Sequence, residues 1–190
     1  MKKLLISTLL ASSLGLVGLA NAEESYTADP SHTFVSFEYS HIGYSVQRSR
    51  FDNVQSTFTL DSAKKSASVE VTIEPKNVNT GWEKFNQHLQ SEDFFDVAKY
   101  PTITFKSTKV AFKGQNPSEI TGDLTIKGIT KPVTLKVTNF VCKPHPFTKK
   151  DACGANATAT IKRSEFDLGK FAPAVSDETK LIITLEATKN

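Results

Sequence analysis

Apolar and polar side chains alternate with a period of two along most of this sequence. The alternation recurs in short segments at residues 35–39, 54–60, 69–73, 103–105, 110–112, 120–126, 133–137, 155–161 and 181–187. A period of two is typical of β-strands with one buried face. Turn-forming residues separate the segments, as in Gly114-Gln115-Asn116-Pro117 and Lys127-Gly128. The sequence therefore predicts an all-β fold of about eight short antiparallel strands, arranged as a closed barrel or a sandwich.

Residues 80–97 interrupt the alternation with a helical pattern. Thr80 and Glu83 form a T-x-x-E capping box, which predicts the start of a helix. Ser91 is placed to cap a second short helix, and Pro101 prevents any further helix. A helical insert rich in aromatic residues needs an apolar surface to cover. We therefore expect a lid at the mouth of a barrel, formed by Trp82, Phe85, His88, Leu89 and Phe94.

The segment at residues 155–161 indicates space inside the barrel. Ala155, Ala157 and Ala159 occupy successive inward positions, where a packed core normally has larger side chains. One interpretation is that large neighbours such as Phe37 or Phe105 fill the gap. The other is an apolar ligand cavity, since barrels of this size can hold one small ligand. The residues predicted to line this pore are Val35, Phe37, Tyr39, Phe58, Ile103, Phe105, Leu124, Ala157, Ala159, Ile183 and Leu185.

The first 22 residues have the pattern of a cleaved secretory signal peptide. Lys2 and Lys3 precede an apolar stretch, and Ala20-Asn21-Ala22 is an A-x-A cleavage site. We therefore expect export to the periplasm and one domain at residues 23–190. Without the two lysines of the signal, 21 Lys and Arg residues balance 20 acids, which disfavours nucleic-acid binding. No later segment is apolar enough for a transmembrane span, so we do not expect an integral membrane protein.

Two cysteines, Cys142 and Cys153, flank a ten-residue loop between two predicted strands. An isolated pair in an exported protein predicts a disulfide bond. The alternatives are a metal site that includes His145, or a redox pair. The wide spacing disfavours both, because redox and zinc motifs use close C-x-x-C pairs. We expect neither a metal nor a cofactor.

The four histidines give weak support for catalysis. His32, His41, His88 and His145 form no H-E-x-x-H pattern or similar close ligand pair. Residues 43–47 begin like a G-x-S-x-G nucleophile motif but lack its second glycine. A small enzyme that uses His88 or His32 remains an alternative hypothesis, without a recognisable nucleophile–base pair. We predict no enzyme activity and no catalytic residue.

Several segments together resemble the YceI family of exported, lipocalin-like, polyisoprenoid-binding proteins. The resemblance covers nearly all of residues 23–190, and it is most specific at residues 93–108 and 122–133. The chain departs from the family pattern at Phe85-Asn86-Gln87, where many members have Arg-Asp, and at Ser49-Arg50, where many have glycine. The remaining matching segments are residues 29–32 with Val35 and Phe37, His41 with Gly43 and Ser45, residues 88–91, residues 163–166 and residues 175–178.

The resemblance implies an extended antiparallel lipocalin-like β-barrel whose pore holds a long isoprenoid chain. Combined with the predicted signal peptide, it predicts a soluble periplasmic carrier of a polyprenyl or quinone type lipid. A module that docks a membrane redox protein is the other alternative, through exposed strand edges or the lid. The sequence leaves open whether the barrel forms a homodimer.

Overall fold

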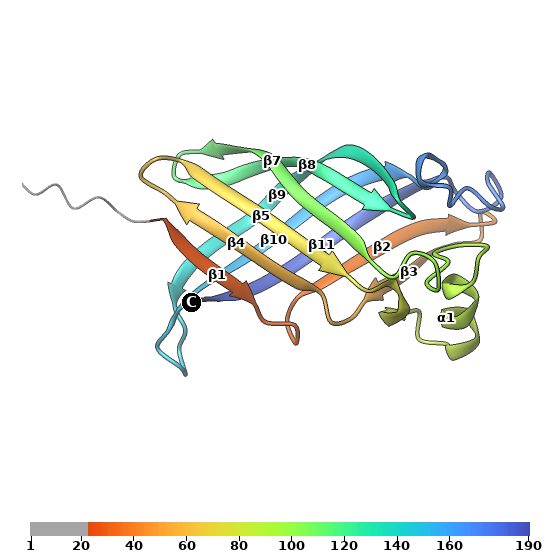
Figure 1. Ribbon diagram of the computed structural model, residues 1–190, viewed down its shortest axis with the longest axis horizontal. Helices are drawn as coiled ribbons and strands as arrows, with labels where there is room; N and C mark the ends of the chain where they lie inside the picture. Colours follow the sequence, from red (N-terminus) through yellow and green to blue (C-terminus); the bar gives the residue numbers. More distant parts are fainter. Residues whose placement is uncertain (1–22) are drawn as a thin grey trace, which may run out of the picture.

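The computed structural model describes residues 23–190 as an elongated antiparallel β-barrel (Figure 1). The predicted signal peptide lies outside the described residues. Eight strands close the barrel, because β1 at one edge of the sheet pairs with β11. In barrel order they are β1 (Glu24–Ala28), β4 (Gln55–Asp61), β5 (Ser66–Ile73), β7 (Ile103–Lys113), β8 (Asn116–Ile126), β9 (Ile129–Pro144), β10 (Asp151–Lys162) and β11 (Glu178–Lys189). The predicted all-β barrel is confirmed.

Three further strands extend the sheet beyond β11: β2 (Phe34–His41), β3 (Ser45–Phe51) and β6 (Val78–Asn79). β1 and β2 both pair with β11, but along different parts of it. Residues 29–33 connect β1 to β2. The sequence pattern did not predict β3. Its buried Ser49 is polar and lies between Arg48 and Arg50, so apolar and polar residues do not alternate at this point.

The α-helix α1 (Glu83–Gln90) follows β6 and the short 3-10 helix η1 (Pro75–Asn77), and it is the one α-helix within residues 23–190. The predicted capping box is wrong: the N-cap is Trp82, and no side chain caps the helix. Thr80 instead donates from its backbone N–H and its hydroxyl to Asn86 Oδ1, both at 2.8 Å. The predicted second helix is a series of turns, in which the N–H groups of Phe94 and Asp96 donate to the Ser91 carbonyl.

Two core clusters lie inside the barrel. The larger contains Phe37, Phe51 and Leu89 and packs below α1. The smaller contains Tyr26, Phe58 and Cys153. Within residues 23–190, no helix has the length and hydrophobicity needed to cross a bilayer.

The predicted disulfide is confirmed. Cys142 and Cys153 are directly opposite each other in the hairpin of β9 and β10, and their sulfur atoms are bonded. In Figure 1 this hairpin lies at one end of the barrel, whereas α1 lies at the other. The disulfide therefore closes the hairpin far from the helical end.

Candidate functional site

The interior of the barrel holds two adjoining cavities. The larger, about 450 Å³, lies below α1, and the smaller, about 130 Å³, lies deeper between the strands. Four residues line both cavities: Val35, Ile73, Leu124 and Leu181. The two spaces therefore meet at a shared waist of apolar side chains.

Strand alternation sets which residues face this space. Val35, Phe37 and Tyr39 are two residues apart on β2, so they point to the same side of the sheet. In the neighbouring strand β11, Ile183 lies opposite Val35 and Leu181 lies opposite Phe37. Directly opposed residues share a face, so the apolar surface continues from strand to strand.

All but one of the residues predicted to line the pore lie on a cavity wall. Ala159 is the exception: it is half-buried, lies opposite Leu181, and lines neither cavity. The longer Leu181 side chain reaches the cavity surface where the methyl group of Ala159 does not. The large side chains of Phe37 and Phe105 line the space without filling it. The predicted residues that do line a cavity are divided between the two spaces: Phe37, Tyr39 and Ile103 line the larger cavity, Phe58, Phe105, Ala157, Ile183 and Leu185 line the smaller, and Val35 and Leu124 line both.

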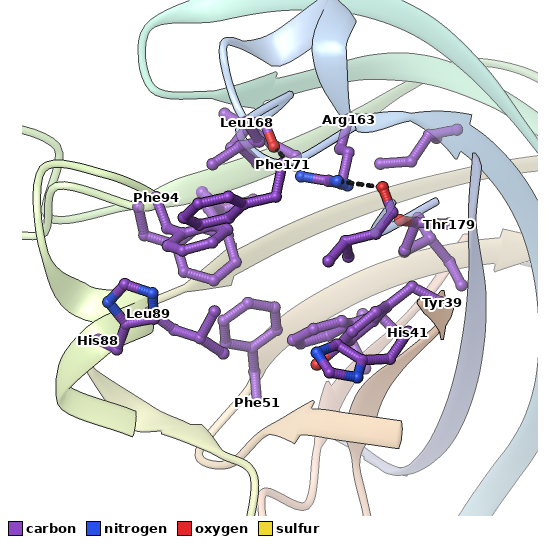
Figure 2. Close-up of a pocket in the computed structure, with 18 of the residues that line it drawn as sticks. Tyr39, His41, Phe51, His88, Leu89, Phe94, Arg163, Leu168, Phe171 and Thr179 are labelled. Atoms are coloured by element: carbon purple, nitrogen blue, oxygen red, sulfur yellow. Dashed lines mark hydrogen bonds between the residues drawn. The ribbon is translucent and has the colours of Figure 1, made fainter. Parts of the chain in front are cut away.

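The segment around α1 covers the larger cavity. Phe85, His88, Leu89 and Phe94 line the space, and Figure 2 shows the last three along its α1 side. Trp82 does not line it. As the extended N-cap residue it precedes the first helical turn, and it is 64 % exposed. Of the residues predicted to form the lid, Trp82 is therefore the one that does not contact the cavity.

Arg163 is a cavity residue that the alternation pattern could not identify. It opens the 3-10 helix η2 (Arg163–Phe166) after β10, and it is only 8 % exposed. Its guanidinium donates to four backbone carbonyls of the following loop, those of Leu168, Lys170 (2.9 Å), Val175 (2.6 Å) and Ser176 (2.7 Å). Burial lowers the pKa of Arg163, and the charge of Asp177 opposes this effect. A period of two carries no information about such a side chain, which follows the end of a strand.

Tyr39 lines the larger cavity with its ring, whereas its hydroxyl oxygen has almost no accessible surface. Its oxygen is buried, and among the described residues it has no hydrogen-bond partner of normal geometry. Burial raises the pKa of Tyr39, whereas Ser49 and the charge of Arg163 oppose the rise. Tyr39 and Arg163 both line the larger cavity.

The histidines separate into cavity and surface residues. His41 and His88 line the larger cavity. His32 lies on the surface, where its Nδ1 atom is 2.8 Å from Asp29 Oδ2 and 3.0 Å from Ser31 Oγ. Serine and aspartate therefore meet the same ring nitrogen, unlike a catalytic triad, in which they contact different nitrogens.

The alternative metal site at His145 is not formed, because both cysteines are consumed by the disulfide. Across residues 23–190, no group of three or more His, Cys, Asp or Glu side chains is arranged to hold a metal ion. The cavity walls thus offer an apolar surface with a few polar groups and no metal centre in the described chain.

Comparisons with known proteins agree on one family. The model of the YceI-like domain matches residues 26–187. Protein YceI of Salmonella arizonae is 39 % identical over 192 aligned positions, covering 100 % of this chain and 99 % of the relative. A UPF0312 protein of Pseudomonas aeruginosa is 36 % identical with the same coverage.

Solved structures share the barrel. BcnA of Burkholderia cenocepacia superposes with a TM-score of 0.74 at 28 % identity, covering 85 % of this chain and 99 % of that protein. A polyisoprenoid binding domain of Saccharophagus degradans, implicated in plant cell wall breakdown, has a TM-score of 0.61 at 16 % identity, covering 88 % and 99 %. The second similarity establishes a common fold only.

Proposed function

The chain belongs to the YceI family, and we propose that it is a periplasmic carrier that binds a long-chain isoprenoid lipid inside its barrel. The observation that carries the proposal is the pair of adjoining apolar cavities of about 450 and 130 Å³. Their shared waist at Val35, Ile73, Leu124 and Leu181 lets one extended tail pass from the larger space into the smaller.

The chemistry of the walls suits a hydrocarbon tail. Each methylene removed from water contributes about 0.8 kcal/mol, so affinity grows with the length of tail enclosed. A protein of the same fold is described as a polyisoprenoid binding domain, which supports an isoprenoid as the tail. Polyprenyl and quinone lipids both satisfy these requirements.

The proposed location rests on two features. The Cys142–Cys153 disulfide is of a kind that persists in oxidising compartments such as the bacterial periplasm. The pattern of residues 1–22 is that of a cleaved signal peptide. A carrier in that compartment would shield an isoprenoid tail from water.

Native mass spectrometry of the protein purified from its own periplasm tests the proposal. We expect a discrete adduct that organic extraction identifies as a polyprenyl or quinone lipid. A mass that corresponds to the protein alone, and that does not change after incubation with such lipids, would overturn the carrier function. That result would favour an interaction module that docks another protein.

A further inference from the structure

Two exposed segments without charged residues lie side by side at the helical end of the barrel (Figure 1). Residues 39–47 run from the end of β2 into β3, and residues 171–176 belong to the loop before β11. Neither segment contains Asp, Glu, Lys or Arg. Backbone hydrogen bonds join the two segments, as where the Ile42 N–H donates to the Ala174 carbonyl at 2.8 Å. Together they form one surface, the uncharged face.

Large apolar residues are concentrated on the uncharged face. Four of its residues are more than half exposed: Ile42, Tyr44, Val46 and Phe171. Elsewhere in residues 23–190 only three large apolar residues are exposed, and two of them belong to the β9–β10 hairpin at the other end of the barrel. Exposed apolar groups that gather in one place mark a surface that contacts a protein or a membrane.

Two of these exposed residues also have strained backbones. Ile42 has a φ angle of 55° and Phe171 one of 66°. Glycine and asparagine adopt positive φ angles more readily than a β-branched or aromatic residue does. The fold therefore holds two large apolar side chains partly in solvent at strained positions, which the stability of the loops does not explain. Strain of this kind is concentrated at functional sites.

The uncharged face is continuous with the wall of the larger cavity. Ile42 and Phe171 line that cavity, as do Ala174 and Val175. Figure 2 shows Phe171 and His41, one from each segment, among the side chains around the space. Because Ile42 and Phe171 are both exposed to solvent and exposed to the cavity, they lie at its rim. An apolar surface therefore leads from the outside of the protein into the barrel.

We propose that the uncharged face docks on the surface of a lipid bilayer, with Tyr44, Val46 and Phe171 inserted at the boundary between head groups and acyl chains. Tyrosine is enriched at this depth because its ring is amphipathic. The proposal rests on the proposed function in one respect, namely that the ligand is a membrane lipid. With the rim in the bilayer surface, a tail passes between membrane and cavity without crossing water.

The charges beside the uncharged face indicate apolar rather than electrostatic docking. Arg48 follows residues 39–47 and Lys170 precedes residues 171–176, but each cation already pairs with a carboxylate, Glu38 and Asp93 respectively. Membrane binding through basic clusters depends on anionic lipids and on salt. Binding through buried apolar area depends on neither. We therefore expect docking on neutral bilayers at high salt.

Flotation of the full mature protein with vesicles tests the proposal. The vesicles consist of phosphatidylcholine alone, or of phosphatidylcholine with an equal part of phosphatidylglycerol. We expect the parent to float with both, at low and at high salt. Tyr44→Glu should lower the affinity for vesicles about tenfold or more, because it removes an apolar anchor and places a charge in its position.

Phe147→Glu is the matched control. Phe147 is 88 % exposed, as is Tyr44, but it lies in the loop between β9 and β10 at the other end of the barrel. This variant should float like the parent. Ile42→Asn is a second variant of the uncharged face, and its asparagine suits the positive φ angle. It should also float less than the parent, and urea unfolding should show that all three variants are folded.

A transfer assay separates docking from ligand binding. Radiolabelled geranylgeraniol is placed in the phosphatidylcholine vesicles, and its uptake by the protein is followed over time. Tyr44→Glu should slow uptake in proportion to its loss of vesicle binding. Its dissociation constant for geranylgeraniol in calorimetric titration should equal that of the parent, because Tyr44 lines neither cavity.

Four results would overturn the proposal: a parent that does not float, a Tyr44→Glu variant that floats like the parent, flotation that requires phosphatidylglycerol and disappears at high salt, or a parent dimer that Tyr44→Glu dissociates in analytical ultracentrifugation without any flotation. The last result would assign the uncharged face to a second copy of the chain. Absence of geranylgeraniol binding in calorimetry would instead count against the proposed function, since flotation is scored without the ligand.

Discussion

Two buried cations differ in how their charge is compensated. Lys127 has a side chain that is 7 % exposed, and its Nζ donates to Asp167 Oδ2 at 2.8 Å and to the Asp167 carbonyl at 2.9 Å. This ion pair lowers the pKa of Asp167. Arg163 has only backbone carbonyls as direct partners. Backbone dipoles therefore hold the charge of Arg163, whereas a carboxylate compensates that of Lys127.

The Asp29–His32 pair should respond to pH in a defined window. Hydrogen bonding to Asp29 raises the pKa of His32 above 6.5, and His32 lowers the pKa of Asp29 from 3.8 to about 2. The raised histidine pKa contributes stability below pH 6.5, and this contribution is lost as the pH rises through the folded-state value. The lowered aspartate pKa contributes stability above pH 3.8, and this contribution is lost as the pH falls toward 2.

Asp29→Asn should therefore lower the pKa of His32, as measured by NMR titration of the imidazole signals. Asp123→Asn, at an exposed carboxylate on β8, is the control and should leave the His32 titration unchanged. If His32 titrates identically in Asp29→Asn and the parent, the ion pair does not form in solution.

At the scale of single elements, β10 determines the depth of the cavity. Ala155 and Ala157 line the smaller space, and their short side chains leave room that a larger residue would occupy. The neighbouring residues of the same strand alternate to the outer face. One strand therefore offers both a cavity position and a matched external position for the same substitution.

Ala155→Phe should shorten the longest tail that the barrel accepts. The ring would occupy most of the smaller cavity, so each methylene it excludes lowers affinity about fourfold. In calorimetric titrations we expect geranylgeranyl ligands to lose at least about tenfold in affinity, and farnesyl ligands to lose little. Ala152→Phe, on the outer face of β10, is the control. Equal losses for both tail lengths would contradict a tail that reaches the smaller cavity.

The hairpin of β9 and β10 gains its stability partly from the disulfide. Closing a loop of this length stabilises a fold by roughly 3 kcal/mol in the chain-entropy model. Replacing both cysteines, as Cys142→Ala with Cys153→Ala, should lower the free energy of urea unfolding by about that amount. Neither cysteine lines a cavity, so the affinity for the ligand should not change. A double variant as stable as the parent would show that the hairpin needs no crosslink.

At the scale of the whole molecule, the barrel is closed by segments from the two ends of the described chain. β1 pairs with both β4 and β11, and Tyr26 on β1 is 3 % exposed and stacks on Phe58 with ring centroids 4.7 Å apart. Lys189 Nζ also lies 2.7 Å from Glu24 Oε1 across the same seam. Most of this closure depends on contacts between residues far apart in the sequence.

Tyr26→Ala should weaken the closure of the barrel. Removing a buried aromatic side chain typically costs about 3–5 kcal/mol, so urea unfolding should show a loss of that size. Tyr44→Ala, at a side chain that is 88 % exposed, should stay within about 0.5 kcal/mol of the parent. A loss below about 1 kcal/mol in Tyr26→Ala would mean that β1 contributes little to the barrel.

The sequence alone predicted the features that depend on local patterns. Period-two alternation predicted strands that correspond to most of those observed, because the inward face of each strand must be apolar. Paired cysteines in a predicted hairpin indicated the disulfide. The same alternation placed Val35, Phe37 and Leu124 on the inward face, and each of them lies on a cavity wall.

Only the tertiary structure decided the features that depend on distant neighbours. Arg163 reaches the cavity because the loop after η2 folds back around its guanidinium. Trp82 is exposed because α1 begins one residue after it, and Ala159 lines no cavity because the longer Leu181 lies opposite it. Each of these outcomes follows from strand register and from the sizes of residues brought together by the fold. A local pattern can specify which face of a strand is buried, but not which side chain, arriving from elsewhere in the chain, will share that space.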